Sequence, residues 1–365
     1  MEEKLYQVGL ELIPGIGDVT VKNLIAYCGS ASAIFKSKKG HLANIPGMGP
    51  RNIELLTSTR MLLEAEKIIE SCAALGVNII HYTDPTYPKK LKQVADAPNI
   101  IYTKGKVDHG PRVLAIVGTR NATQYGKEVT ERMVEDSKVL NAAVVSGLAY
   151  GIDFTAHRAA LKNQIPTIAV LAGGLDKIYP NLHRKTAEEM LETGGWISEN
   201  PPGTKPDAHF FPARNRIIAG MSDAVIVVEA ARKGGALITA NIADSYHRPV
   251  FAVPGDLSNT FSEGCNYLIR NQQALIYTGV EDLIYHLNWD LEAGNTPAKK
   301  QADTTTLSDQ ERSIFEILEA NQDGIAIDEL SWKAQIPVNQ VASCLLNMEF
   351  QGFVKSMPGK KYQPR

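Results

Sequence analysis

Basic side chains follow several apolar segments of this chain, at places where they could bind phosphate groups. The stretch IVGTRNATQYG puts Thr119 and Arg120 directly after Gly118. It lacks the second glycine of a dinucleotide-binding turn, G-x-G-x-x-G, which lets the backbone close on a pyrophosphate. An arginine near a helix start instead offers a bidentate fork to a phosphate. A plain surface role for Arg120 is the alternative that the position leaves open.

Two more apolar segments end in a similar way. SGLAYGIDFTAHRAA begins with Ser146 and Gly147, and AGGLDKIYPNLHRK contains Gly173 and Gly174. Polar and aromatic side chains follow the second segment, namely Lys177, Tyr179 and Asn181. A lysine can contact a phosphate and a tyrosine can stack on a base, so these residues suit a nucleotide better than a small acid.

Asp153 and His157 are four residues apart and would share one face of a helix. An acid–base or metal pair is one interpretation of that spacing. A helix capped by Asp153, with the histidine packed inside, is the favoured one.

Aromatic and cationic side chains alternate most densely in HFFPARNRIIAGMSDAVIVVEA, residues 209–230. The candidate binding residues in this run are Phe211, Arg214, Asn215 and Arg216. A groove for single-stranded nucleic acid needs both types, because cations follow the backbone while rings stack on bases, at roughly 1 to 3 kcal/mol per base. In the alternative, the rings belong to the core and the arginines form ion pairs.

Lys233 precedes two glycines and marks another strand end compatible with phosphate. These loops contain no Ser/His/Asp set, no paired carboxylates and no cluster with metal-ligand spacing. We therefore expect neither catalytic residues nor a metal.

Strands and helices alternate in the middle of the chain. Nearly continuous apolar runs of strand length occur at residues 77–82, 113–119, 142–147, 166–173, 224–230 and 249–255, with amphipathic segments between them. This pattern predicts an α/β fold with a parallel sheet buried on both faces. Ligands of such sheets bind beyond the carboxyl ends of the strands, which is where the cations lie.

The pattern divides the chain into four regions. Residues 1–75 are helical and contain two similar turns, PGIG with Gly15 and Gly17, and PGMG with Gly47 and Gly49. Residues 76–290 hold the sheet, residues 291–306 form a polar linker, and residues 307–365 are typical of a winged helix.

Composition limits the possible functions. The formal net charge is −2, so any binding of nucleic acid needs a local basic patch. The four cysteines lie far apart and indicate free thiols in a reducing compartment. We find neither a signal peptide nor an apolar stretch of the ~18 residues that span a membrane, so we expect a cytoplasmic protein without membrane contact.

The loops together resemble the DNA-processing protein A family, also called DprA or Smf. IVGTRNATQYG, SGLAYGID, GGLDKIYP, SENPPGT, FPARNRIIAG, GGALITA and VFAVPG occur in order at that family's spacing, between residues 87 and 281. The resemblance implies an extended Rossmann-like domain that binds single-stranded DNA, forms a homodimer and has no cofactor. It also implies a mediator that protects single strands and loads the RecA recombinase onto them in natural transformation and homologous recombination.

On this resemblance Arg120, Lys177, Arg214 and Arg216 are candidate phosphate contacts. Glycines at 118, 147, 173 and 174 would shape the pocket, and Tyr179 and Phe211 are candidates for stacking. The chain departs from the family at Tyr150, where the family commonly has arginine. The resemblance therefore leaves one phosphate contact open, with stacking by the tyrosine ring as the alternative.

The flanking regions also fit the resemblance. The two glycine turns near the N-terminus resemble helix-hairpin-helix motifs, whose amides grip DNA phosphates, with a purely structural bundle as the alternative. The terminal region from residue 306 has six basic and eight acidic residues, so we expect it to contact protein more readily than duplex DNA.

Two other classes of protein remain open on the sequence. A nucleoside-monophosphate phosphoribohydrolase would need P-G-G-x-G-T-x-x-E, but here Ile242 stands at the position of the glutamate, so the acid–base role has no holder. A transcription regulator, with a winged helix reading duplex DNA, is disfavoured by the acidic balance of that region.

Overall fold

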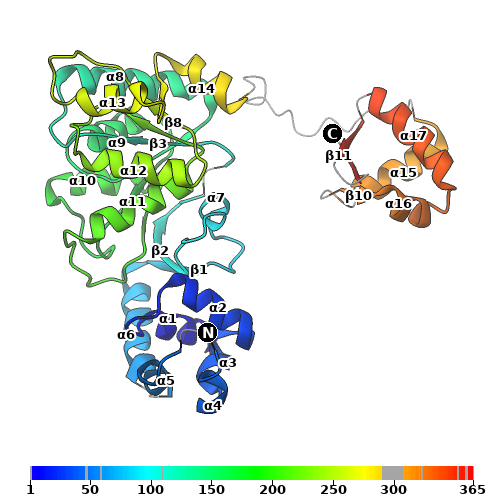
Figure 1. The fold of residues 1–365 in the computed structure, drawn as a ribbon, viewed down its shortest axis with the longest axis horizontal. Coiled ribbons are helices and arrows are strands. Elements are labelled where there is room, and N and C mark those ends of the chain that lie inside the picture. Colours follow the sequence, from blue (N-terminus) through cyan, green and yellow to red (C-terminus); the bar gives the residue numbers. More distant parts are fainter. Residues whose placement is uncertain are drawn as a thin grey trace. The chain divides into compact units, whose positions relative to one another are not determined.

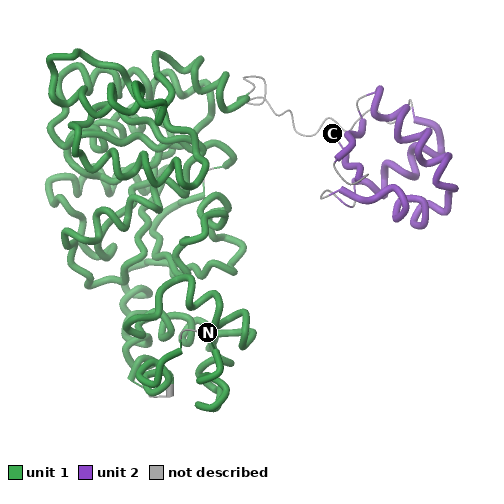
Figure 2. The backbone as a smooth tube through the Cα atoms, in the orientation of Figure 1, with its two compact units in different colours: residues 1–294 green, residues 295–365 purple. Residues whose placement is uncertain are grey.

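Figure 1 shows the fold of the chain, a computed structural model. It describes residues 2–45, 48–57, 60–108, 110–289, 307–319, 321, 324–351, 353–357 and 361–364. The chain forms two compact units, residues 1–294 and residues 295–365 (Figure 2). The predicted linker at 291–306 lies outside the described residues, and the predicted boundary after residue 75 falls inside the first unit.

The N-terminal region of the first unit is helical. Its helices are α1 (Glu2–Glu11), α2 (Asp18–Cys28), α3 (Ala31–Lys36), α4 (Lys39–Leu42), α5 (Pro50–Thr57) and α6 (Arg60–Leu75). Leu10, Leu24 and Ile34 belong to a common apolar core of these helices. Val8 of α1 and Ala65 of α6 face a different cluster, which includes Ile79 and Tyr102 of the sheet. The helical region thus packs directly on one end of the sheet.

The described residues of the first unit form a nine-stranded sheet in the order β1-β2-β6-β5-β4-β3-β7-β8-β9. The strands are β1 (Asn78–His81), β2 (Ile100–Gly105), β3 (Val113–Val117), β4 (Ala143–Ser146), β5 (Thr167–Val170), β6 (Gly195–Ser198), β7 (Ala224–Val227), β8 (Val250–Ala252) and β9 (Leu275–Ile276). From β6 to β9 the pairing is parallel, which confirms the predicted parallel sheet.

One end of the sheet differs from the prediction. β1 pairs antiparallel with β2, and β2 pairs antiparallel with β6, so the run at 77–82 is an edge strand outside the parallel sheet. The sequence pattern also gave no strand at β2, β6 or β9, which are mixed in polarity or only two residues long.

Helices cover both faces of the sheet. They are α7 (Lys89–Lys92), α8 (Gln124–Asp136), α9 (Ile152–Lys162), α10 (Arg184–Met190), α11 (Phe210–Met221), α12 (Gly235–Ser245), α13 (Glu263–Arg270) and α14 (Val280–Leu287), with short 3-10 turns at Ser137–Leu140 and Asn181–His183. All residues of β3 are buried: Val113, Ala115 and Val117 face α11 and α12, while Leu114 and Ile116 face α8 and α9. Burial on both faces explains why the strand is apolar at every position.

The strand order fixes where a ligand can bind. The chain moves outward from β3 through β4, β5 and β6, then returns to the other side of β3 to add β7, β8 and β9. The direction of winding therefore reverses between β3 and β7. In doubly wound sheets the crevice at such a switch point, beyond the strand carboxyl ends, is the usual ligand site.

The second unit is a winged helix, as predicted. It contains α15 (Asp309–Glu319), β10 (Ile325–Ala326), α16 (Ile327–Ala334), α17 (Val338–Phe350), β11 (Val354–Met357) and β12 (Lys361–Pro364). The strands form a small antiparallel sheet in the order β10-β12-β11. Leu318, Leu330 and Leu345 meet in its core, so α15, α16 and α17 enclose one apolar centre.

Candidate functional site

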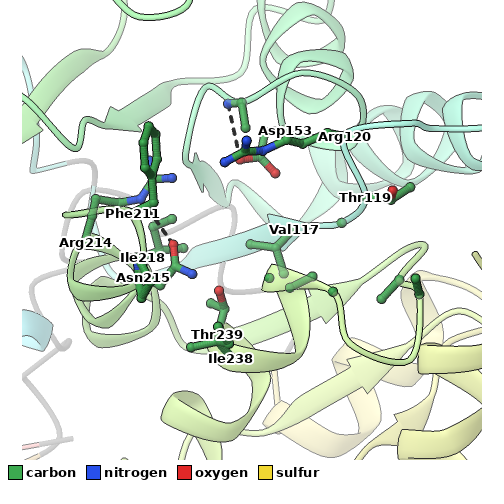
Figure 3. Close-up of a pocket in the computed structure, with 18 of the residues that line it drawn as sticks. Val117, Thr119, Arg120, Asp153, Phe211, Arg214, Asn215, Ile218, Ile238 and Thr239 are labelled. Carbon is green, nitrogen blue, oxygen red and sulfur yellow. Dashed lines mark hydrogen bonds between the residues drawn. The ribbon is translucent and has the colours of Figure 1, made fainter. Parts of the chain in front are cut away.

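A pocket of about 540 Å³ opens at the switch point between β3 and β7. Figure 3 shows its side chains converging from the strand ends and from α11 and α12. We call it the switch-point pocket; its lining includes Gly118, Thr119, Arg120, Asp153, Phe211, Arg214, Asn215, Gly234, Gly235, Ile238 and Thr239. The volume lies within the roughly 300–1,000 Å³ of ligand pockets. Six of the residues predicted from the sequence therefore meet here.

Arg120 and two rings form a platform at the mouth of the pocket. The guanidinium carbon of exposed Arg120 lies 5.3 Å from the centroid of the Phe211 ring, close enough for a cation–π contact. The Phe211 ring centroid is 5.9 Å from that of Tyr179, which is 52% exposed. One cation and two rings are thus available side by side, from the end of β3, the start of α11 and the loop after β5.

Arg214 lies beneath this platform and is almost fully buried. Its guanidinium donates to the carbonyl oxygen of Gly147 at 2.7 Å and to that of Val170. A Cβ atom at Gly147 would lie 2.4 Å from Nη2 of Arg214, so glycine is required there for the arginine to fit. Burial lowers the pKa of Arg214 to about 10, so it remains a cation at neutral pH.

Asp153 supplies the opposite charge at the floor of the pocket. It does not cap α9 as predicted; its carboxylate instead accepts from the backbone N–H groups of Gly147 and Ala149, at 3.2 and 3.4 Å. Burial raises the pKa of Asp153, and the positive charge of Arg214 opposes that rise. The favoured packing of His157 agrees with the structure, because the buried ring shares a hydrogen bond of 2.7 Å with Thr167, and burial lowers its pKa to about 3.

A smaller hollow adjoins the switch-point pocket and shares Phe211 and Arg214 with it. It brings together Gly147, Gly173, Lys177 and Tyr179 from the predicted set. The exposed Lys177 lines this hollow together with Tyr179, so a chain of phosphates leaving the pocket would meet a second cation there.

Several predicted residues do not line these hollows. Ser146 is buried and its hydroxyl donates to the carbonyl oxygen of Ile116 at 2.6 Å, so it stabilises the sheet. Gly174 is buried, with its N–H bound to the carbonyl of Thr204 at 2.9 Å. Asn181 is exposed at the start of a 3-10 turn. Lys233 is exposed in a neighbouring hollow that shares Gly234 and Ile238 with the switch-point pocket.

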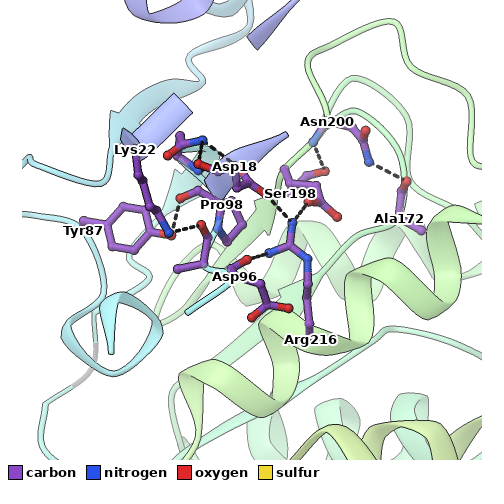
Figure 4. A network of polar contacts seen from close by, with 12 residues as sticks. Asp18, Lys22, Tyr87, Asp96, Pro98, Ala172, Ser198, Asn200 and Arg216 are labelled. Atoms are coloured by element: carbon purple, nitrogen blue, oxygen red, sulfur yellow. Dashed lines mark hydrogen bonds and ion pairs between the residues drawn. The ribbon is translucent and has the colours of Figure 1, made fainter. Parts of the chain in front are cut away.

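Arg216 has a different place from the one predicted. Its guanidinium forms ion pairs with Asp18 of α2, at 3.1 Å, and with Glu199, and it also donates to the carbonyl oxygen of Asp96 (Figure 4). It therefore does not belong with the candidate phosphate contacts, because both carboxylates already satisfy its charge. Its role is to hold the helical region against the sheet.

The first glycine turn adjoins the same group of charges. Gly17 precedes α2 and lines a hollow together with Glu11, Asp18 and Glu199. This lining contains acidic side chains and neither lysine nor arginine, so neither Gly17 nor the nearby exposed Gly15 has the surroundings expected of a DNA contact. In the second turn, Gly49 is exposed, and Gly47 lies outside the described residues.

Glu11 gives this region a pH dependence. Burial, reinforced by the negative charge of Asp18, raises the pKa of Glu11 from 4.5 to about 7, although the charge of Arg216 lowers it. The folded protein therefore holds this proton more tightly than the unfolded chain, and the free energy of unfolding should fall as the pH rises from about 4.5 to about 7. Urea denaturation of Glu11→Gln at pH 5 and pH 8 should show a smaller difference than wild type. Equal differences in the two proteins would contradict this assignment.

In the described part of the chain, no group of three or more His, Cys, Asp and Glu side chains could hold a metal ion. None of the helices in that part is long and apolar enough to cross a membrane.

Fold and site together define a class: a doubly wound α/β protein with a cationic, aromatic pocket at its switch point, followed in the chain by a winged helix. Residues 78–288 match the sequence profile of DNA recombination-mediator protein A, and residues 297–360 match that of the DprA winged helix domain. The chain belongs to the DNA recombination-mediator protein A family.

Relatives support this assignment along the whole chain. Protein Smf of Synechocystis sp. is 32% identical over 100% of this chain and 99% of its own. The X-ray structure of DNA processing protein A from Streptococcus pneumoniae has a TM-score of 0.66 and 32% identity, covering 77% of this chain and 97% of that one. A structure of DNA processing protein A from Helicobacter pylori, described as giving insight into its single-stranded DNA binding mode, has a TM-score of 0.53 and 30% identity over 58% of this chain and 95% of its own.

Proposed function

We propose that this protein binds single-stranded DNA in the switch-point pocket and the adjoining hollow. The observation that carries the proposal is the platform of Arg120, Phe211 and Tyr179 above the buried cation Arg214. Stacked rings accept any base and the cations accept the backbone, so this combination suits a single strand. The Helicobacter pylori relative, which is described as binding single-stranded DNA, supports the proposal.

Charge within the pocket also favours an anion. Burial lowers the pKa of Arg214, the negative charge of Asp153 opposes that fall, and the positive charge of Arg120 adds to it, so two guanidinium groups share one site with a single carboxylate. The start of α12 lines the same pocket, and its N-cap residue Gly234 provides no side chain to bond the free amides. A phosphate between the arginines and these amides would balance the second positive charge and satisfy the amides.

The mediator role is part of the same proposal. We propose that the protein protects single strands, loads the RecA recombinase onto them in natural transformation and recombination, and acts as a homodimer. The edge strand β9 supports dimer formation, since Leu275 and Ile276 are 37% and 48% exposed at the end of the sheet. An uncovered apolar edge is a surface on which a second chain can pair.

The proposal is tested by fluorescence anisotropy with labelled oligo(dT), a duplex of the same length and labelled AMP. We expect tight binding of oligo(dT), weaker binding of the duplex and no binding of AMP. The logarithm of the binding constant should fall linearly with the logarithm of the salt concentration, with a slope of about −0.7 per phosphate contacted. Adding purified RecA afterwards tests loading, as faster filament formation on the coated strand. Equal affinity for duplex and single strand would contradict the proposed site.

Tyr150 tests the departure from the family. Its ring is 43% exposed and lies edge-on to His183, with centroids 4.8 Å apart, in the loop that also carries Ala149 of the pocket. Tyr150→Arg should strengthen binding of oligo(dT) by about threefold to tenfold at low salt, because it adds one charge-assisted phosphate contact. Tyr150→Phe is the control and should bind like wild type. Unchanged affinity in the arginine variant would place Tyr150 away from the bound strand.

A phosphoribohydrolase activity is not favoured. Ile242, at the position where those enzymes need a glutamate, packs against the apolar core beneath α12 and offers no acid or base. Incubation of the protein with AMP should therefore release no adenine.

A further inference from the structure

A buried carboxylate occupies the start of the helix that follows the first parallel strand. Glu229 lies two residues beyond β7 and is 1% exposed. Its two oxygens accept from the backbone N–H of Thr123, at 2.9 Å, and from the hydroxyl of Thr123, at 2.5 Å. Thr123 is the N-cap of α8, so the carboxylate lies against the positive end of that helix.

The glycine at position 126 makes room for the Glu229 carboxylate at the start of α8. A Cβ atom at Gly126 would come within 2.2 Å of Oε2 of Glu229, so only glycine lets the carboxylate approach the first turn. The hydroxyl of Thr123 accepts from the N–H of Gly126, at 3.2 Å, while it donates to Glu229. Thr123, Gly126 and Glu229 thus close the helix start with groups from the protein itself.

Nucleotide-binding sheets use the same place for a different anion. In doubly wound folds the turn after the strand at the switch point leads into a helix whose N-terminus binds a phosphate. Here that strand is β3 and that helix is α8. We propose that the Glu229 carboxylate is a built-in anion that fills the phosphate position and so excludes free nucleotides from the N-terminus of α8.

This inference goes beyond the proposed function and does not depend on it. It concerns the helix start at α8, whereas the proposed strand contacts lie on Arg120, on α11 and at the start of α12. A phosphate brought to α8 would meet a buried negative charge that already accepts two hydrogen bonds from Thr123. The protein would therefore reject cellular mononucleotides and dinucleotides there even if it bound no DNA.

The test is to remove the carboxylate and supply an anion. Glu229→Ala opens the space and leaves the amides of α8 exposed to solvent, whereas Glu229→Gln keeps the volume filled without the charge. The thermal midpoint of each protein is measured in 20 mM pyrophosphate and in sodium chloride of equal ionic strength, with ³¹P NMR of the pyrophosphate to detect binding. Pyrophosphate should raise the midpoint of E229A by about 3 °C or more beyond the effect on wild type. E229Q should respond like wild type.

Two results would overturn the proposal. One is an equal response of wild type and E229A to pyrophosphate, which would mean that Glu229 only caps the helix. The other is broadening of the ³¹P signal by wild type and its loss in E229A, which would mean that Glu229 helps to bind anions. Should E229A not fold in chloride, the yield of refolding in pyrophosphate against chloride decides, because a filled anion site must increase it.

Discussion

Replacing Arg120 with alanine should weaken the binding of oligo(dT) by about tenfold to a hundredfold at low salt. A hydrogen-bonded contact between a guanidinium and a phosphate contributes about 1.5–3 kcal/mol. The variant also removes the cation that lies over the Phe211 ring, where a base would stack. Titration by fluorescence anisotropy over a range of salt concentrations measures both the affinity and the slope, which should become shallower by about 0.7.

A matched variant separates the local effect from the change in net charge. Arg132 is an exposed arginine on α8, outside the lining of the pocket, so Arg132→Ala removes one charge without touching the site. It should bind oligo(dT) within about twofold of wild type, because distant exposed charges are screened. If both variants lose affinity equally, the pocket is not the place where the strand binds. Unfolding curves of both should match that of wild type, since Arg120 is itself exposed.

Replacing Arg216 with methionine should lower the free energy of unfolding by about 3 kcal/mol or more, measured by urea denaturation. The arginine side chain is 15% exposed, and its partners Asp18 and Glu199 are 23% and 18% exposed. Removing the cation leaves two carboxylates close together in a largely buried place, and such losses typically cost about 3–5 kcal/mol.

Two further variants check that interpretation. Arg216→Met combined with Glu199→Gln should recover part of the loss, because one uncompensated charge disappears. Arg184→Met breaks an ion pair with Glu188 in which the side chains are 68% and 53% exposed, and it should change the stability by less than about 0.5 kcal/mol. If Arg216→Met and Arg184→Met lower the free energy of unfolding by similar amounts, the ion pair between α2 and α11 is no stronger than a surface ion pair.

The sequence predicted the parts of the fold that depend on local pattern. β3, β4, β5, β7 and β8 are runs of apolar residues because they are buried on both faces, and their carboxyl ends therefore identify the switch point. β9 has only two residues and β6 begins with glycine, so neither has a detectable pattern.

Most contacts between side chains that are distant in the chain could not be predicted from local sequence pattern. Arg120 and Phe211 follow from the rule that strand ends share one edge, and the structure brings them together. Arg216 follows Phe211 on the same helix, α11, and its sequence context gives no reason to separate it from the pocket residues. Its partner Asp18, however, is 198 positions away. The role of Glu229 has only one signal in the sequence, a lone acidic residue at the end of an apolar strand. Its partner Thr123 follows a different strand, so the contact between them has no local signal.

Helix α11 carries side chains for two separate tasks within two turns. Phe211 and Arg214 face the pocket, while Arg216 faces Asp18 and Glu199. Because each residue of an α-helix is rotated by roughly 100° from the one before, inserting or deleting a single residue between 211 and 216 would misdirect one set or the other. The rotational phase of α11 therefore has to suit the pocket and the N-terminal helical region together, and the spacing in FFPARNR must be kept for both surfaces at once.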